Sequence, residues 1–402
     1  MVDDAKVRAG RAASLRLASG RTLWVKVHRY IGLFLGAIFV VVGLTGSVLA
    51  FWQTIDEWLN KDIMIVGVPP GEASLRSLDA ILAAANAAAP PHGKPMLVTM
   101  PRHSSAAVSI TYSVSTQDKQ PDQYEIFVNP YIAEATGQRF LQHADSVLSM
   151  PLIRTIISLH ASLLFGDDRR YVVGIPAIFL LVSLTAGIYL WWPRNRNWRH
   201  ALSIKWGATP VRLTYDVHKT TGLYLYVVLT IVLFSGIYMI FKAEVQSLVG
   251  MFSPVRGEPK DLKSKPLPGQ PPLGLDVAAK IADKVFPVGK LHWIFLPQGR
   301  DGVYVVGEQE DEEPNRWATY RNVTIDQYSG EILYVQDRAK FSAGERFLEW
   351  QYPLHCGEAF GNAGRAFIFA LGFVPLILYV TGFMRWRQKR RVRKQQPLTN
   401  AR

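Results

Sequence analysis

Long apolar runs separated by polar segments are the main pattern along this chain. Four runs, at about 31–52, 171–192, 222–241 and 366–383, are long enough to cross a bilayer, which needs roughly 20 apolar residues of helix. Buried helices of a soluble protein are the alternative, but each run ends in aromatic or basic residues, as membrane helices do. The pattern therefore predicts four transmembrane helices, with a kink at Pro375 in the last one.

The first run also resembles the apolar part of a signal peptide, but it is too long. Such segments have about 7–15 apolar residues. We therefore expect an uncleaved membrane anchor.

Basic residues predict the orientation of these helices. The segments 1–30, 193–221 and 384–402 adjoin the apolar runs and hold 21 of the 45 Lys and Arg residues, but only three of the 32 acidic residues. Because basic loops stay in the cytoplasm, both termini are predicted to be cytoplasmic, and the connections 53–170 and 242–365 to lie outside. The formal net charge of +13 is thus a topology signal, and we expect the lipid bilayer rather than a nucleic acid as the partner of these charges.

The two halves of the chain repeat each other. VHRYIGLFLG in the first half aligns with VHKTTGLYLY in the second, and LHASLLFG aligns with LHCGEAFG. The residues that recur in register are His28 with His218, Gly46 with Gly236, His160 with His355, and Gly187 with Gly382. Both halves enter from the cytoplasm, so the repeat is parallel, with its axis along the membrane normal. Each outer connection adds an Ala-rich amphipathic helix, at 77–88 and 275–285, and alternating β-like runs.

The motifs just quoted, with GLTGSVLAFW and the strand-turns NPY…TG and DQYSGE, resemble the PepSY-associated transmembrane family over about residues 24–387. That family includes inner-membrane ferric-siderophore reductases and related iron-uptake proteins of Gram-negative bacteria. The resemblance implies a haem-containing reductase of the bacterial inner membrane that moves electrons outward. It also implies that the outer segments are PepSY-like and periplasmic.

The expected fold is a membrane α-helical bundle of four transmembrane helices with a parallel two-fold internal repeat, and two α+β PepSY-like extracytoplasmic domains. In chain order we expect a basic N-terminus (1–23), the first transmembrane helix (24–53), the first periplasmic domain (54–150), an interfacial helix with the second transmembrane helix (151–193), a cytoplasmic loop (194–215), the third transmembrane helix (216–242), the second periplasmic domain (243–345), an interfacial segment with the fourth transmembrane helix (346–387), and a basic tail (388–402).

The predicted topology sorts the four repeated histidines into two layers. His28 and His218 begin outward-going helices near the cytoplasmic face, whereas His160 and His355 precede inward-going helices near the outer face. The parallel axis brings equivalent residues together. Two imidazoles facing each other can hold one iron, and haems in helix bundles take ligands from facing helices. We therefore expect two b-type haems, with iron bound by His28 and His218 inside and by His160 and His355 outside.

Several of these residues also fit simpler structural roles. A histidine beside Lys26 and Arg29 can simply lie among lipid headgroups. A structural zinc site is disfavoured because each layer has two histidines and no nearby thiolate or carboxylate. Four glycines in the first apolar run allow close approach of either a helix or a flat macrocycle: Gly32, Gly36, Gly43 and Gly46.

Two roles stay open for three arginines near the outer histidines, which either pair with haem propionates or anchor the chain at the membrane interface: Arg169, Arg170 and Arg365. An aromatic belt at the membrane surface is predicted for Trp52, Trp191, Trp192 and Trp386.

The absence of several sequence motifs limits the kinds of cofactor that the chain itself can bind. The sequence has no GxGxxG, P-loop or HExxH pattern, and its single cysteine excludes an intramolecular disulfide and a thiolate-held iron–sulfur cluster. The electron donor is therefore expected to be a cytoplasmic reductase, a small reduced carrier or the quinol pool. No catalytic side chain is assigned, because outer-sphere electron transfer needs none.

Three functions are compatible with these observations. The first is a reductase that passes electrons to a periplasmic ferric siderophore and releases Fe(II). The alternative is a non-enzymatic membrane scaffold or regulator whose PepSY-like domains bind a periplasmic peptide or protein. A transporter is disfavoured because the four apolar runs contain almost no charged residues.

Overall fold

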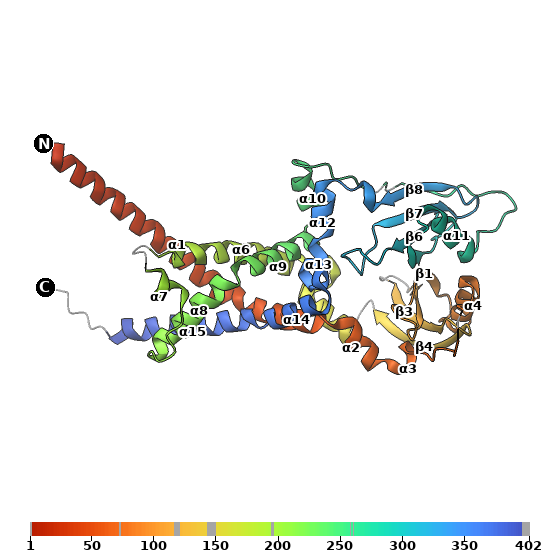
Figure 1. Ribbon diagram of the computed structural model, residues 1–402, viewed down its shortest axis with the longest axis horizontal. Coiled ribbons are helices and arrows are strands. Elements are labelled where there is room, and N and C mark those ends of the chain that lie inside the picture. The colour runs from red at the N-terminus through yellow and green to blue at the C-terminus, as the bar shows by residue number, and fades with distance from the viewer. Residues whose placement is uncertain are drawn as a thin grey trace. The chain divides into compact units, whose positions relative to one another are not determined.

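Apolar helices and antiparallel strands lie in two separate units of the chain (Figure 1). The computed structural model describes residues 2–71, 74–115, 121–142, 150–193, 197–257, 259 and 261–395, and within these the side chains of residues 20–392. The helical unit comprises Met1–Ala50, Ser158–Ala243 and Leu354–Arg402, and the sheet unit comprises Phe51–Ile157 and Glu244–Pro353. Parts of the predicted basic segments lie outside the described residues, including Arg194 and Arg196 of the loop and the tail from residue 396.

Long helices form the helical unit. They are α1 (Val2–Leu49), α6 (Tyr171–Trp191), α8 (Pro210–Tyr224), α9 (Tyr226–Ile240), α14 (Gly361–Leu371) and α15 (Val374–Gln395). Helix α1 packs against α6 and α15, while α6 also contacts α9 and α15 contacts α8 (Figure 1). Within the described residues, Gly20–Leu49, Tyr171–Trp191 and Glu358–Val392 are each long and apolar enough to cross a membrane.

The third predicted helix differs from the expectation, because it is broken. Helices α8 and α9 meet at Leu225 with a bend of 63°, and together they make a fourth span only if the bent pair is counted as one. Gly222, a weak helix former, lies one turn before the break. Helix α8 is also bound to the segment before it, since the Lys219 ammonium donates to the carbonyl oxygens of His200 and Ser203. An apolar run alone does not reveal such a bend.

The break between α14 and α15 lies where Pro375 predicted a kink. Helix α14 ends at Leu371, four residues before Pro375, whose ring would clash with the Leu371 carbonyl in a continuous helix. Gly372 and Gly43 meet here, and a Cβ on either would collide with the backbone oxygen of the other. The Ser47 hydroxyl donates to the Phe369 carbonyl at 2.7 Å. This glycine contact therefore brings α1 and the fourth apolar segment close together.

One continuous antiparallel sheet organises the sheet unit. Helix α4 (Leu78–Ala88) precedes β1 (Lys94–Thr99), β2 (Val108–Val114), β3 (Asp122–Asn129) and β4 (Glu134–Gln142). Helix α11 (Leu275–Val285) likewise precedes β5 (Lys290–Phe295), β6 (Val303–Gln309), β7 (Arg321–Asp326) and β8 (Ile332–Asp337). The strand order is β4-β3-β2-β1-β5-β6-β7-β8. The two segments expected to form separate domains therefore share a sheet, joined where Val98 of β1 lies opposite Ile294 of β5.

Short elements complete both units. They are α2 (Trp52–Leu59), α3 (Lys61–Met64), α5 (Leu152–Ser162), α7 (Trp198–Leu202), α10 (Lys242–Gly250), α12 (Ala343–Glu349) and α13 (Gln351–Cys356), with 3-10 turns at Asp167–Arg169, Arg338–Lys340 and Glu358–Phe360. Helices α5 and α13 correspond to the predicted interfacial segments that carry His160 and His355.

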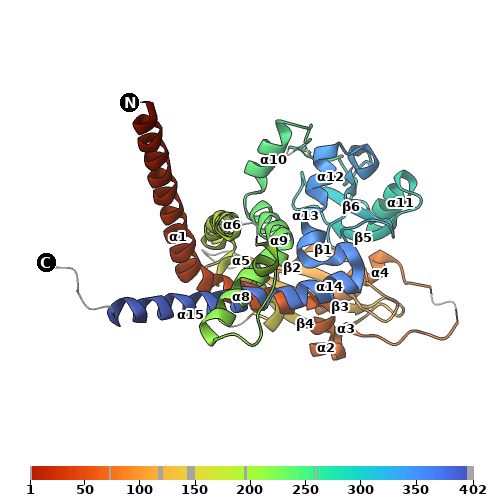
Figure 2. The same cartoon turned by 60° about the vertical axis from the view of Figure 1, so that its left-hand side comes forward.

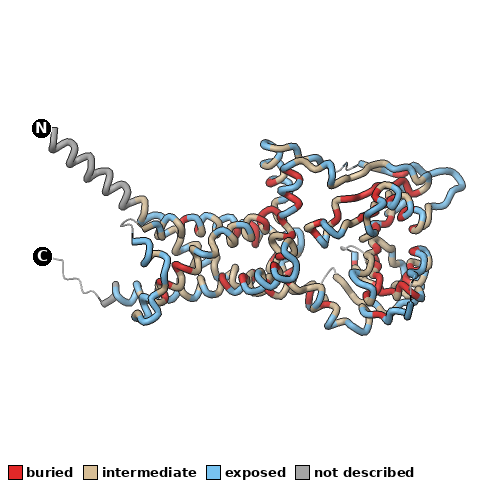
Figure 3. Tube along the Cα trace, viewed as in Figure 1, coloured by how far each residue is buried: buried red, intermediate tan, exposed pale blue. Residues whose placement is uncertain are grey.

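The core of the sheet unit lies between the sheet and the helices α4 and α11, which are visible beside the strands in Figure 2. Figure 3 shows buried residues along the strands. The residues of this core come from alternate positions of β2, β3, β6 and β7 and from one stripe of each helix, as expected for elements with one covered face. The buried residues include Ile81, Ala85, Ile110, Ile126, Ala278, Ala282, Val306 and Val323.

Two aspartates join the starts of α4 and α11 reciprocally. The Asp276 carboxylate accepts from the backbone N–H groups of Leu78 and Asp79, at 2.9 and 3.2 Å. The Asp79 carboxylate accepts from the N–H groups of Leu275 and Asp276, at 2.7 and 3.4 Å. Each helix thus supplies an acceptor to the unpaired amides and positive dipole end of the other. Burial raises the pKa of Asp276, but these backbone donors outweigh burial and hold that pKa below its usual range.

We expect Asp276→Ala to destabilise the sheet unit by about 1–2 kcal/mol, the typical cost of a lost N-cap. Hydrogen exchange of the α4 and α11 amides in the full-length protein measures this change. Because the folded pKa of Asp276 is lowered, its stabilising contribution is present above the unfolded pKa and is lost as the pH falls through the folded pKa. The difference between wild type and variant should therefore shrink below about pH 4. Lys284→Ala, an exposed change on α11, is the control, and an equal effect there would contradict the capping role.

Candidate functional site

The structure brings the four repeated histidines together as two pairs, both within the helical unit. His28 of α1 faces His218 of α8, with 6.1 Å between ring centroids and 81° between ring planes. His160 of α5 faces His355 of α13, with 6.0 Å and 72°. Each pair therefore combines residues that align between the two halves of the sequence.

Every one of these imidazoles is held through its Nδ1 atom. A helix carbonyl oxygen of the same half of the chain lies within hydrogen-bonding distance of each Nδ1. The distances are 2.9 Å from His28 to Ser183, 2.9 Å from His160 to Val42, 3.1 Å from His218 to Leu378 and 3.1 Å from His355 to Val232. A carbonyl oxygen cannot donate, so Nδ1 must carry the proton. Nε2 is then left with a lone pair, as a metal-binding histidine requires.

A hydroxyl group supports three of these hydrogen bonds from a fixed position. Thr45, Ser235 and Thr381 each lie three residues after the accepting carbonyl, with their oxygens 3.2, 3.0 and 2.9 Å from Nδ1. The Thr45 and Thr381 hydroxyls donate their own protons to carbonyls four residues earlier in the helix. Their oxygens can therefore accept from Nδ1–H.

The fourth histidine uses a variation of this arrangement. On α6 the corresponding position is Ala186, which has no hydroxyl. Ser183 supplies both groups instead, because its carbonyl oxygen lies 2.9 Å and its hydroxyl 3.1 Å from His28 Nδ1.

A glycine four residues after each accepting carbonyl forms the floor under the ring. A Cβ atom there would lie 3.0–3.4 Å from the imidazole Cε1, which is tighter than an ordinary contact. The pairs are Gly46 with His160, Gly187 with His28, Gly236 with His355, and Gly382 with His218. We call the carbonyl, the hydroxyl and the glycine together an imidazole cradle. The sequence predicted Gly46 as a packing position and placed all four glycines in register between the halves, but it missed the hydroxyls, although Thr-Gly or Ser-Gly recurs at three of the four sites.

A cavity of about 450 Å³ surrounds the His28–His218 pair. Its walls come from α1, α6, α8, α9 and α15 and are mostly apolar, with glycines at Gly32, Gly36 and Gly222. The volume is within the range of small-molecule and cofactor sites. Its basic lining residues are Arg21, Arg29, Lys219, Arg385 and Lys389.

The donor set limits what the histidine pairs can hold. Among the described residues there is no group of three or more His, Cys, Asp or Glu side chains that could hold a metal ion. Two imidazoles alone do not complete a structural zinc site. They do suit an iron whose other ligands come from a macrocycle.

The three arginines considered for propionates are engaged elsewhere. Arg170 pairs with Asp167 at 3.0 Å, and Arg169 lies 4.0 Å from Asp168. The Arg365 Nε donates to the Ala50 carbonyl oxygen at 2.6 Å. These contacts suit local anchoring of turns and helix ends.

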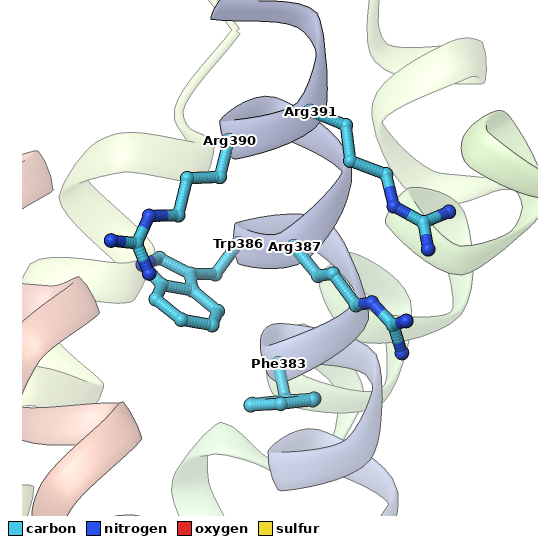
Figure 4. Close-up of a pocket in the computed structure, with 5 residues that line it drawn as sticks. All are labelled: Phe383, Trp386, Arg387, Arg390 and Arg391. Atoms are coloured by element: carbon cyan, nitrogen blue, oxygen red, sulfur yellow. The ribbon is translucent and has the colours of Figure 1, made fainter. Parts of the chain in front are cut away.

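A second hollow, of about 360 Å³, lies on the surface of α15 (Figure 4). It is lined by Phe383, Trp386, Arg387, Arg390 and Arg391, and the Arg390 guanidinium lies 5.2 Å from the centre of the Trp386 ring. Aromatic and basic residues on one helix are typical of a membrane–water interface. The surface has no histidine or carboxylate in its lining, so it is not a candidate redox site.

Comparison with known proteins agrees with the motifs. A family model described as the PepSY-associated TM region matches residues 25–389, which include all four histidines and their cradles. No curated protein sequence matches the chain. The family resemblance expected from the sequence is confirmed, and the apolar helices indicate a membrane protein. The chain therefore belongs to the PepSY-associated transmembrane family.

Proposed function

We propose that this protein is an inner-membrane di-haem b-type reductase. The observation that carries the proposal is the pair of facing imidazoles, found twice, with every Nδ1 tied to a cradle. His28 and His218 would hold the haem iron on the cytoplasmic side, and His160 and His355 would hold it on the periplasmic side. With a histidine from each side as ligand, the iron would keep no open position, which suits electron transfer rather than oxygen chemistry.

The separation of the rings supports an iron between them. Metal–imidazole bonds of about 2 Å, extended by the radius of each ring, put two ring centres roughly 6 Å apart across one metal. The observed separations are 6.1 and 6.0 Å. An edge-to-face contact between rings has a similar spacing. That contact alone would not require a cradle at each of four histidines.

The cradles set the ligand properties of each histidine. A Nδ1–H that donates to a carbonyl fixes the tautomer and the ring orientation, and it makes Nε2 a stronger electron donor. The glycine floor lets the ring lie close to the helix that holds it. When bound, each haem would supply a one-electron carrier within the helical unit. The protein contributes ligands, orientation and an apolar surrounding.

The direction of transfer follows from the predicted topology. The charge of the basic segments supports a topology with both termini in the cytoplasm and the two large connections in the periplasm. We propose that electrons enter from a cytoplasmic reductase, a reduced carrier or quinol, and leave to a periplasmic ferric siderophore. One electron converts the chelated Fe(III) to Fe(II), and oxygen chelators hold Fe(II) much less tightly. The family resemblance supports this class of substrate.

The purified protein should show a b-type haem spectrum with two haems per chain. His160→Ala and His355→Ala should each remove the same single haem and abolish ferric-siderophore reduction, while His28→Ala removes the other. Absorption spectra with a haem-to-protein ratio measure this. His103→Ala, at an exposed position in the sheet unit, is the matched control and should keep both haems. A colourless protein from haem-supplied cells would overturn the proposal and favour the scaffold or regulator.

Gly46→Ala tests the cradle of the periplasmic pair. The new Cβ would lie 3.0 Å from His160 Cε1, so the ring must shift away from its hydrogen-bonding position. We expect roughly tenfold weaker retention of the haem held by His160 and His355, a typical effect of disturbing the groups that orient a metal ligand. Gly20→Ala on the same helix is the control, because a Cβ there meets nothing within 4 Å. Unchanged haem retention in Gly46→Ala would show that the cradle does not position the ligand.

A further inference from the structure

The cavity around His28 and His218 is strongly asymmetric in charge. Among the described residues, its lining contains five cationic side chains and no Asp or Glu. The rest of the lining is largely apolar, apart from the histidines, Ser183 and aromatic residues. Such a site suits a ligand with a broad apolar body and an anionic edge.

The ammonium group of Lys219 has its hydrogen-bond donors occupied by acceptors of the protein itself. Its ammonium donates to the carbonyl oxygens of His200 and Ser203, at 2.7 and 3.1 Å, and to the Asp216 carboxylate at 3.1 Å. These three acceptors match the three donors of an ammonium. A ligand in the cavity must therefore be recognised by other cations.

Arg21 and Arg385 are placed differently. Arg21 lies seven residues before His28 on α1, so both project from the same face of the helix. Arg385 lies three residues after Gly382 on α15, on the face that holds His218. The two arginines thus come from opposite halves of the chain, each on a helix that contacts one member of the histidine pair.

Both guanidinium groups keep donors for a ligand. Arg21 uses Nη2 to donate to the Leu190 carbonyl oxygen at 2.8 Å, which leaves four of its five N–H groups. Arg385 lies 4.2 Å over the centre of the Tyr215 ring, and stacking leaves the N–H edge of the guanidinium uncovered by that ring. The Asp216 carboxylate pairs with Arg212 and Lys219. Among the residues the structure describes, neither Arg21 nor Arg385 makes an ion pair with a carboxylate.

We propose that Arg21 and Arg385 bind the two propionate carboxylates of the haem held by His28 and His218. This rests on the proposed function and deepens it, because it assigns the orientation of the macrocycle. A dicarboxylate enters an apolar cavity only if its charges are paired, and arginine matches a carboxylate in a two-point fork. The propionate edge then faces the basic end of the cavity, the end at which an electron donor from the cytoplasm would approach.

The test compares haemin with haemin dimethyl ester, which lacks the two negative charges. Apoprotein carrying His355→Ala, purified in detergent from haem-deficient cells, offers the inner pair alone and is titrated with each compound by absorbance. We expect at least tenfold tighter binding of haemin than of its ester. Arg385→Gln and Arg21→Gln should each reduce that preference about tenfold, the effect of one hydrogen bond to a charged group. Arg385→Lys should keep part of it.

Two comparisons make the result decisive. Binding of the ester should be the same in all variants, which shows that the cavity remains folded. Arg390→Gln is the matched control, because Arg390 lies on α15 outside the cavity lining and should leave the preference unchanged. Equal affinity for haemin and its ester, or equal effects of Arg390→Gln and Arg385→Gln, would overturn the inference while leaving the haem assignment intact. Binding of neither compound would overturn the proposed function as well.

Discussion

The hydrogen bond from each histidine Nδ1 to a helix carbonyl is the interaction on which the site depends. It ties a histidine to a helix of its own half, so that Nε2 can face the equivalent histidine of the other half. A buried imidazole without this partner would leave a polar N–H unsatisfied, which is costly in an apolar surrounding. The accepting carbonyls and hydroxyls belong to α1, α6, α9 and α15, so the histidine pairs and the packing of the bundle are set by the same contacts.

In both units, the two halves of the chain are joined by contacts between residues that align with each other in the sequence. In the helical unit, equivalent histidines face each other. In the sheet unit, equivalent aspartates exchange hydrogen bonds between the starts of α4 and α11, and the edge strands β1 and β5 pair. The sheet thereby gains a continuous core and loses two exposed edges, which are a liability in isolated domains. Neither half of the sheet unit has this arrangement alone.

The sequence predicted those features of the fold that depend on the pattern of nearby residues. The apolar runs, the break near Pro375, the amphipathic helices and the register of His28 with His218 follow from composition and spacing. The bend at Leu225 does not, because an apolar run shows that a segment is long enough to span a membrane but not where its helix breaks. The merging of two sheets does not either, since alternation shows which residues face inward but not which edge pairs with which. The hydroxyls of the cradles, such as that of Thr45, were hidden because Ser and Thr in apolar helices usually bond within their own helix.

Under the proposed function, the charges near the two histidine pairs would affect the direction of electron transfer. Arg169 and Arg170 have acidic neighbours, and Arg365 is bound to a carbonyl. Arg21 and Arg385, by contrast, bring two positive charges to the cavity of the other pair. Unpaired, they would favour the less positive, reduced state of an iron nearby and so hold an electron on the inner side. Under the proposed function, pairing with two carboxylates would cancel the contribution of these two arginines to the field, so that they would no longer oppose outward transfer.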